Sequence, residues 1–108
     1  MKRQTIPHIV MDELWYGAFV AYNYSDVSNV ITVSVMSDSG YLAQTITKTI
    51  PAFGRVVIDQ EDVEGRGTFS IIIDGPDDLM IVPQQLLIRS GVFLPIPVYT
   101  PTGTLKNL

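Results

Sequence analysis

The sequence predicts an all-β fold, an antiparallel immunoglobulin-like or jelly-roll-like β-sandwich of seven or eight short strands. Apolar residues recur at every second position almost throughout the chain, which is the period of a strand with one buried face. Turn-forming residues interrupt this alternation about every 8–12 residues, a spacing typical of sandwiches. No segment has the i, i+3, i+4, i+7 apolar period of an amphipathic helix, so we expect none.

The length of 108 residues suits one domain. We expect a single sandwich over 1–108, with loose tails at about 1–5 and 102–108. The expected strands cover 6–10, 16–24, 30–37, 41–50, 55–60, 68–74 and 79–82, followed by further extended stretches at 84–89 and 92–101.

The first two strands have clear local signals. Pro7 lies within 6–10 and has no N–H for a sheet ladder, which predicts an edge strand. The strand at 16–24 ends in the stretch SDVSN, whose short polar side chains favour a turn because they bond their own backbone.

The next two strands form a predicted hairpin. The strand at 30–37 alternates Ile31, Val33 and Val35 with small polar residues or Met36. Gly40 can take the positive φ that the following tight turn requires. The strand at 41–50 carries a row of threonines on one face, which predicts a sheet face in contact with water.

The second half continues the pattern. The turn PAFG precedes the strand at 55–60, and the strand at 68–74 points Phe69, Ile71 and Ile73 inward. The seventh strand meets Pro83, where we expect it to stop. Three prolines in 92–101 forbid a helix and predict extended backbone there.

The stretch WYGAFVAYNYSD at 15–26 is apolar or aromatic on both faces of a strand. By alternation one face carries Trp15, Gly17, Phe19, Ala21 and Asn23, and the other carries Tyr16, Ala18, Val20, Tyr22 and Tyr24. If Phe19 points into the core, Val20, Tyr22 and Tyr24 point outward and need a cover.

The composition also indicates covered surface. Hydrophobic residues make up 46% of the chain and charged residues 17%, below the typical value of about 25%. The mean hydropathy is +0.26. The apolar runs are far shorter than the roughly 18 residues of a membrane-spanning helix, so we expect no transmembrane segment. Association with other protein chains is the better interpretation.

The net charge and the amino-terminal sequence limit the possible binding partners and the expected cellular location. The net charge is −4 with scattered basic residues, so we expect no nucleic-acid partner. The absence of cysteine excludes disulfides and thiolate metal sites. The first residues lack the apolar core of a signal peptide, which predicts a cytoplasmic protein, or an extracellular one if a signal was removed.

No residue pattern indicates catalysis. His8 is the single histidine, and a surface or structural role is the simpler interpretation. Acidic pairs at 12–13, 61–64 and 77–78 can in principle serve glycoside hydrolysis or bind calcium, but solvated turn carboxylates explain them better. We therefore expect no enzyme, no catalytic residue, no metal and no cofactor.

Two family resemblances follow from longer stretches. The segments NYSDVSNVITVSVMSDSG, TIPAFGRVVID and FSIIIDGPDDLMIVPQQ, within about 18–89, resemble the sensory rhodopsin transducer family of small bacterial proteins. That resemblance implies a cytoplasmic β-sandwich that forms cyclic tetramers and contacts a membrane photoreceptor. The segments IPHIV, Trp15, NYSD and SDSG resemble β-sandwich modules of bacterial secreted and surface proteins, which implies an extracellular binding or spacer unit.

Two functional hypotheses remain open at the sequence level. The first is a homo-oligomeric protein-interaction module whose outer face is built from Val20, Tyr22 and Tyr24, joined by Ile72 or Met36. The second is a carbohydrate-binding or cell-surface module in which the same tyrosines form a platform with Trp15 or Asn23. A small hydrolase built on the acidic pairs ranks well below both.

Overall fold

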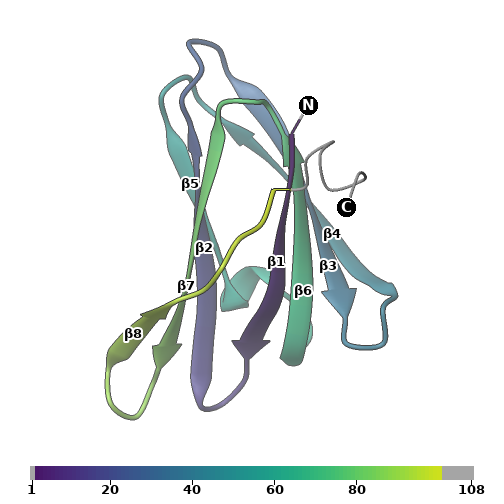
Figure 1. Cartoon of the computed structure of the whole chain (residues 1–108), viewed down its shortest axis with the longest axis vertical. Helices are drawn as coiled ribbons and strands as arrows, with labels where there is room; N and C mark the ends of the chain where they lie inside the picture. The colour runs from purple at the N-terminus through teal and green to yellow at the C-terminus, as the bar shows by residue number, and fades with distance from the viewer. Residues whose placement is uncertain (1, 101–108) are drawn as a thin grey trace, which may run out of the picture.

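The computed structural model describes residues 2–100, which form eight strands and one short 3-10 turn (Figure 1). The elements are β1 (Lys2–Met11), β2 (Trp15–Asn23), β3 (Asn29–Ser37), β4 (Leu42–Ile50), β5 (Arg55–Asp59), η1 (Gln60–Asp62), β6 (Gly67–Gly75), β7 (Leu79–Leu87) and β8 (Val92–Pro95).

Two antiparallel sheets of four strands pack against each other. One has the strand order β1-β6-β3-β4 and the other β5-β2-β7-β8. Only the β3–β4 and β7–β8 connections join neighbours within one sheet, and the other connections pass between sheets (Figure 1). The predicted all-β sandwich is therefore confirmed, with eight strands.

The core lies between the two sheets and follows the predicted alternation. Ile31, Val33 and Val35 of β3 are fully buried, as are Ile71 and Ile73 of β6. They meet Phe19 and Ala21 of β2, also fully buried, from the opposite sheet. Burial of such side chains stabilises the fold by about 1.5–3 kcal/mol each.

Strand β1 is an edge strand, as Pro7 predicted. Its register with β6 shifts between Ile6 and Ile9, so Pro7 and His8 stand exposed in an irregularity of the β-bulge type. The expectation of a loose tail at about 1–5 is wrong for 2–5, because Lys2 to Thr5 pair with β6. Residue 1 and the expected tail at 102–108 lie outside the described residues.

The prediction that the seventh strand stops at Pro83 is also wrong. Pro83 is buried within β7 opposite Phe19, and the strand continues to Leu87. The N–H and C=O of one strand residue point to the same side, and the Pro83 carbonyl accepts from Ile96 N at 3.3 Å. The missing N–H of Pro83 therefore points away from β2, toward the segment that follows β8, so no bond of the β2–β7 ladder is lost.

The segment after β8 closes one side of the sandwich. Ile96 is buried and Val98 packs on the core. Tyr99 then forms an antiparallel bridge with Thr5, with N···O distances of 2.7 and 2.8 Å. The chain thus crosses from the β8 edge of one sheet to the β1 edge of the other.

The sheets approach closely where β2 faces β1. A Cβ on Gly17 would lie 2.9 Å from Ile9 Cγ1 and 3.0 Å from Met11 Cγ. Glycine at this position lets the two core residues of β1 pack directly on the β2 backbone. In the β3–β4 turn Gly40 has a φ of 89°, as predicted.

Within residues 2–100, the structure holds no helix of the length and hydrophobicity needed to cross a membrane.

Candidate functional site

Strand β2 has the two faces that its sequence indicated. Phe19 and Ala21 point into the core and are fully buried. Val20 and Tyr22 point to the other side and are half-buried, although no second layer formed by residues 2–100 covers them. Their partial burial comes from neighbours within the same sheet.

Those neighbours form a continuous surface, here called the outer face, made of the outward side chains of β5, β2, β7 and β8. Residues opposite each other on adjacent strands point to the same side of a sheet. The strand pairing gives four rows across the sheet: Arg55–Tyr22–Met80, Val57–Val20–Val82, Asp59–Ala18–Gln84–Pro95 and Tyr16–Leu86–Phe93.

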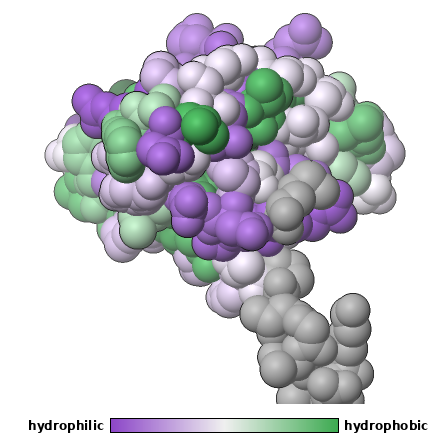
Figure 2. Space-filling model, turned by 90° about the horizontal axis from the view of Figure 1, so that it is seen from above, coloured by the Kyte–Doolittle hydropathy of each residue, from purple (hydrophilic) through white to green (hydrophobic). Residues whose placement is uncertain are grey.

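The outer face is strongly apolar for a surface in contact with water. Val57 is 50% exposed, Met80 49% and Phe93 63%. Val57, Val20 and Val82 form a row without a polar side chain across three strands. Seen from above, hydrophobic residues lie on the side where Figure 1 places β5 and β8, and others lie near the centre and on the opposite side (Figure 2). A continuous apolar patch of this kind marks an interaction surface more often than an ordinary one.

The outer face of the other sheet is mostly polar. One of its rows runs Arg3–Asp74–Thr32–Thr47, and the next runs Thr5–Ile72–Ser34–Thr45. The threonines of β4 are exposed, as predicted. Ile72 and Met36 belong to this second surface, so the expectation that they extend the surface of Tyr22 is wrong. The two faces lie on opposite sides of the sandwich.

Tyr22 and Tyr24 lie together where β2 ends. Their rings stack with centroids 6.2 Å apart and planes 19° from parallel. Tyr24 is 55% exposed and also lines an open hollow of about 390 Å³ with Lys2, Asp78 and Met80. The outer face therefore ends in an aromatic pair beside charged groups.

Asn23 is wrong as a platform residue, because it is fully buried. Its Nδ2 donates to the carbonyls of Val27, Ile50 and Pro51 at 2.9–3.2 Å. Its Oδ1 accepts from Ser25 N and Asn29 Nδ2. These bonds tie the two loops at this end of the sandwich together, which is a structural role.

Trp15 is also wrong as a member of this platform. It is half-buried, it shares the inward side of β2 with Gly17 and Phe19, and it begins the strand that Tyr24 follows. Trp15 and Tyr24 are nine positions apart along the extended chain, which is about 30 Å at 3.3–3.4 Å per residue. One ligand platform cannot contain both side chains.

Tyr16 and Asp59 form a polar corner of the outer face. Burial raises the pKa of Tyr16, and a hydrogen bond with Asp59 and the negative charges of Glu61 and Asp62 raise it further. Asp59 Oδ1 also caps η1 by accepting from Glu61 N at 2.9 Å. The tyrosine therefore stays protonated and donates to a carboxylate that the local turn holds in place.

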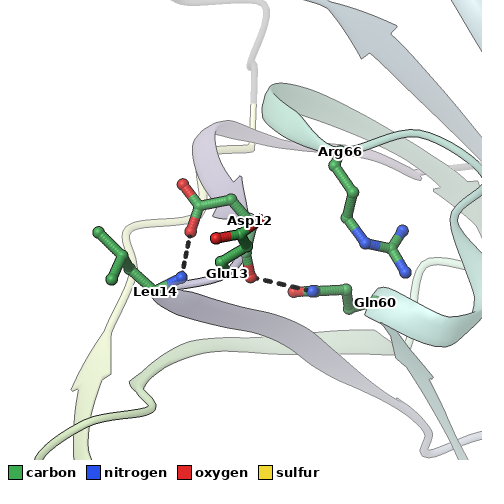
Figure 3. Close-up of a pocket in the computed structure, with 5 residues that line it drawn as sticks. All are labelled: Asp12, Glu13, Leu14, Gln60 and Arg66. Atoms are coloured by element: carbon green, nitrogen blue, oxygen red, sulfur yellow. Dashed lines mark hydrogen bonds between the residues drawn. The ribbon is translucent and has the colours of Figure 1, made fainter.

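Another hollow lies at the opposite end, with a volume of about 510 Å³ and Asp12, Glu13, Leu14, Gln60 and Arg66 around it (Figure 3). Its polar groups bind the backbone. Asp12 Oδ1 accepts from the N–H groups of Leu14 and Trp15, and Gln60 Nε2 donates to Asp12 O. Arg66 donates to the carbonyls of Val63 and Gly65. This arrangement stabilises two turns and gives no support for a catalytic pair.

The acidic groups singled out by the sequence do not all meet in one cluster. Asp62 bonds the backbone of Asp59, as part of a capping box. The 61–64 and 77–78 pairs lie beyond opposite ends of β6, whose nine residues span about 30 Å. Across residues 2–100, no group of three or more histidines and carboxylates could hold a metal ion. His8 is exposed at the bulge of β1.

The outer-face residues that come from β5, β7 and β8 were not singled out from the sequence. Val57, Met80, Val82 and Phe93 come from strands that it predicted, but nothing in their local pattern marks them as neighbours of Val20. The alternation of 55–59 offers a weak signal, since Val56 and Val57 are apolar on both sides of the strand. Register between strands brings these residues together, and register is a long-range property.

Comparison with known proteins supports the fold. No family model and no curated protein matches the chain. A solved structure, described as the crystal structure of Thermotoga maritima 1070, superposes with a TM-score of 0.72 over 93% of this chain and 90% of that chain. The sequence identity is 8%, so this similarity shows the sandwich fold alone.

Proposed function

We propose that the chain is a non-enzymatic protein-interaction and assembly module that associates with copies of itself through the outer face. The observation that carries this proposal is the difference between the two sheets. One outward surface presents valine, methionine and phenylalanine across four strands, whereas the other presents mainly threonine, serine and an ion pair, with Val30, Ile72 and Met36 among them. A chain that only needed solubility would gain from two polar surfaces.

The hydrophobic effect provides the driving force for this association. Exposed apolar side chains on adjacent strands release ordered water when another apolar surface covers them. Tyrosine, methionine and phenylalanine are enriched at interface cores, and Tyr22, Met80 and Phe93 supply all three. The resemblance to transducer-type adaptors is consistent with such a module and adds a tetramer and a protein partner as expectations.

The test compares two exposed valines on opposite sides of the sandwich. Val57 on the outer face is 50% exposed, and Val30 on β3 of the other sheet is 57% exposed. Val57→Ser should weaken self-association measured by sedimentation equilibrium, while Val30→Ser should leave it unchanged. Equal effects of the two substitutions would argue against the outer face.

Carbohydrate binding is the alternative, and the stacked pair of Tyr22 and Tyr24 favours it. Aromatic rings beside Asp78 and Lys2 offer stacking and hydrogen bonds to a sugar. Isothermal titration calorimetry with oligosaccharides separates the two functions. The unchanged chain and the Tyr24→Ala variant are titrated in the same way. Binding heat that is present with the unchanged chain and lost in the variant supports sugar binding. No binding heat with either protein argues against the carbohydrate-binding function.

A further inference from the structure

We propose that the outer face pairs with the same face of a second copy about a two-fold axis that runs along the row Val57–Val20–Val82. This inference rests on the proposed function, since it specifies how self-association occurs. The occupant of the outer face is then a second copy of this chain, placed with its strands antiparallel to the first.

The row pattern makes the outer face self-complementary under this rotation. The row Arg55–Tyr22–Met80 lies on one side of the valine row, and the row Asp59–Ala18–Gln84 lies on the other. A two-fold axis in the plane of contact, along the valine row, carries each of these rows onto the other. Sheets that pack face to face keep their strands within about 30° of each other, which preserves the matching near the axis.

The charges at the β5 end match across the proposed interface. The rotation places Arg55 against the partner's Asp59, and Asp59 against the partner's Arg55. Arg55 is exposed and has no ion-pair partner within residues 2–100, while Asp59 is held in place by the backbone of η1. Two such contacts form at once, because an interface with two-fold symmetry repeats every contact.

The side-chain sizes match as well. Tyr22, the bulkiest residue of its row, faces the partner's Ala18, which is the smallest residue of the opposite row. Val57, Val20 and Val82 each face their own copies at the axis. Large side chains set against small ones let two faces interdigitate, as they do inside a sandwich.

The sheet edges are less suited to association than the face. The β1 edge carries the exposed Pro7, is bridged by Tyr99, and has its Val10 N–H bonded to Gln85 Oε1 at 2.7 Å. In β4, Lys48 lies opposite the buried Ile31 and so points inward, a feature that discourages edge pairing. Strands β5 and β8 are short. These features disfavour edge pairing and leave the apolar face as the better surface.

The size of the outer face is adequate for a dimer. The strands β5, β2, β7 and β8 have 5, 9, 9 and 4 residues, which at about 3.3 Å per residue and about 4.8 Å between strands cover a plane of roughly 430 Å². Projecting side chains enlarge its accessible area toward the approximately 800 Å² per partner of a standard interface.

Cross-linking tests the axis, because the chain contains no cysteine. Val57 lies on the edge strand β5, at the rim of the proposed interface, so a short bis-maleimide can reach it. Val57→Cys should cross-link to its own copy, and Val30→Cys should not. A mixture of Arg55→Cys and Asp59→Cys should give mainly the mixed dimer, because each position faces the other.

Charge exchange provides the second arm. Arg55→Glu alone and Asp59→Lys alone each place like charges together twice, and should weaken self-association by about tenfold or more. Mixing the two variants should restore it, since both contacts then pair opposite charges. Thermal melting checks that Asp59→Lys and Asp59→Cys stay folded without the capping oxygen, and the Val57→Cys cross-link does not depend on either variant.

The outcomes separate this inference from the proposed function. If the unchanged chain self-associates but Val57→Cys cross-links no better than Val30→Cys, the two-fold arrangement is overturned and self-association stands. Mixed variants that fail to restore association, with both folded, overturn it as well. If the unchanged chain stays monomeric, the proposed function itself fails.

Discussion

At the scale of single residues, Asn23 shows why a polar side chain can be fully buried in this fold. Its amide group bonds three carbonyls and accepts two N–H groups, so no polar atom is left unsatisfied. Two of the bonded carbonyls, those of Val27 and Pro51, belong to the loops that follow β2 and β4, and the third belongs to Ile50, the last residue of β4. The Asn23 side chain therefore supplies hydrogen bonds to backbone groups at this end of the sandwich.

Asn23→Ala should destabilise the fold by about 1–3 kcal/mol, because it removes the donor of three carbonyls and a bond to each of two N–H groups. Chemical denaturation measures the free energy of unfolding. Ser28→Ala in the same loop, at an exposed position, is the matched control and should cost far less. A variant as stable as the unchanged chain would mean that water replaces the amide group fully.

At the scale of elements, the side chains on the two sides of each strand in the β5-β2-β7-β8 sheet have different roles. The inward side chains contribute to the stability of the fold, and the outward ones are those expected to contribute to self-association. Phe19 and Tyr22 are three positions apart on β2, yet one is fully buried in the core and the other lies on the outer face. Changes at the two positions should therefore affect different measurements.

Phe19→Ala should lower the free energy of unfolding by roughly 3–5 kcal/mol, as large-to-small core changes do. Tyr22→Ser should reduce self-association more than it reduces stability. Denaturation at a concentration where the chain is monomeric, together with sedimentation equilibrium, gives the two quantities. The opposite ordering would contradict the assignment of the two faces.

An ion pair between β1 and β6 makes a pH-dependent contribution to the stability of the fold. Arg3 Nε and an Nη of Arg3 donate to the Asp74 carboxylate at 2.7 and 3.0 Å, between residues directly opposite in the ladder. These hydrogen bonds, and the positive charge of Arg3, hold the pKa of Asp74 below its ordinary value of 3.8, against a smaller opposing effect of burial.

Because the pKa of Asp74 is lower in the folded state, its contribution to stability is present above about pH 4 and is lost as the pH falls through the folded-state pKa. The stability difference between the unchanged chain and Asp74→Asn should therefore shrink below about pH 4. Salt should also reduce the difference at neutral pH, since the Arg3 side chain of the pair is largely exposed. A difference that stays constant down to pH 2.5 would contradict the ion pair.

At the scale of the whole molecule, the sequence predicted what depends on local alternation. The strand faces of Phe19, Ile31 and Ile71, the turn at Gly40 and the edge position of Pro7 were confirmed, because each follows from period, backbone angle or a missing N–H. The extent of β1 and β7 was not predicted, since pairing with a neighbouring strand overrides a local proline.

The candidate site was predicted in part for the same reason. Val20 and Tyr22 were placed on the outward side of β2, but Trp15 and Asn23 were grouped with them by closeness in sequence. Alternation already put those two on the other side of the strand. Val57, Met80 and Val82 reach the outer face through the pairing of β5 and β7 with β2, which spans up to sixty residues or so of chain and leaves no local signal.

The central claim is that the outer face is covered by another copy of the chain. The most direct test is the mass of the unchanged chain in solution, measured by light scattering at micromolar concentration. The account predicts a mass of at least two chains of 12.0 kDa each. A mass of 12.0 kDa over the whole concentration range would contradict it.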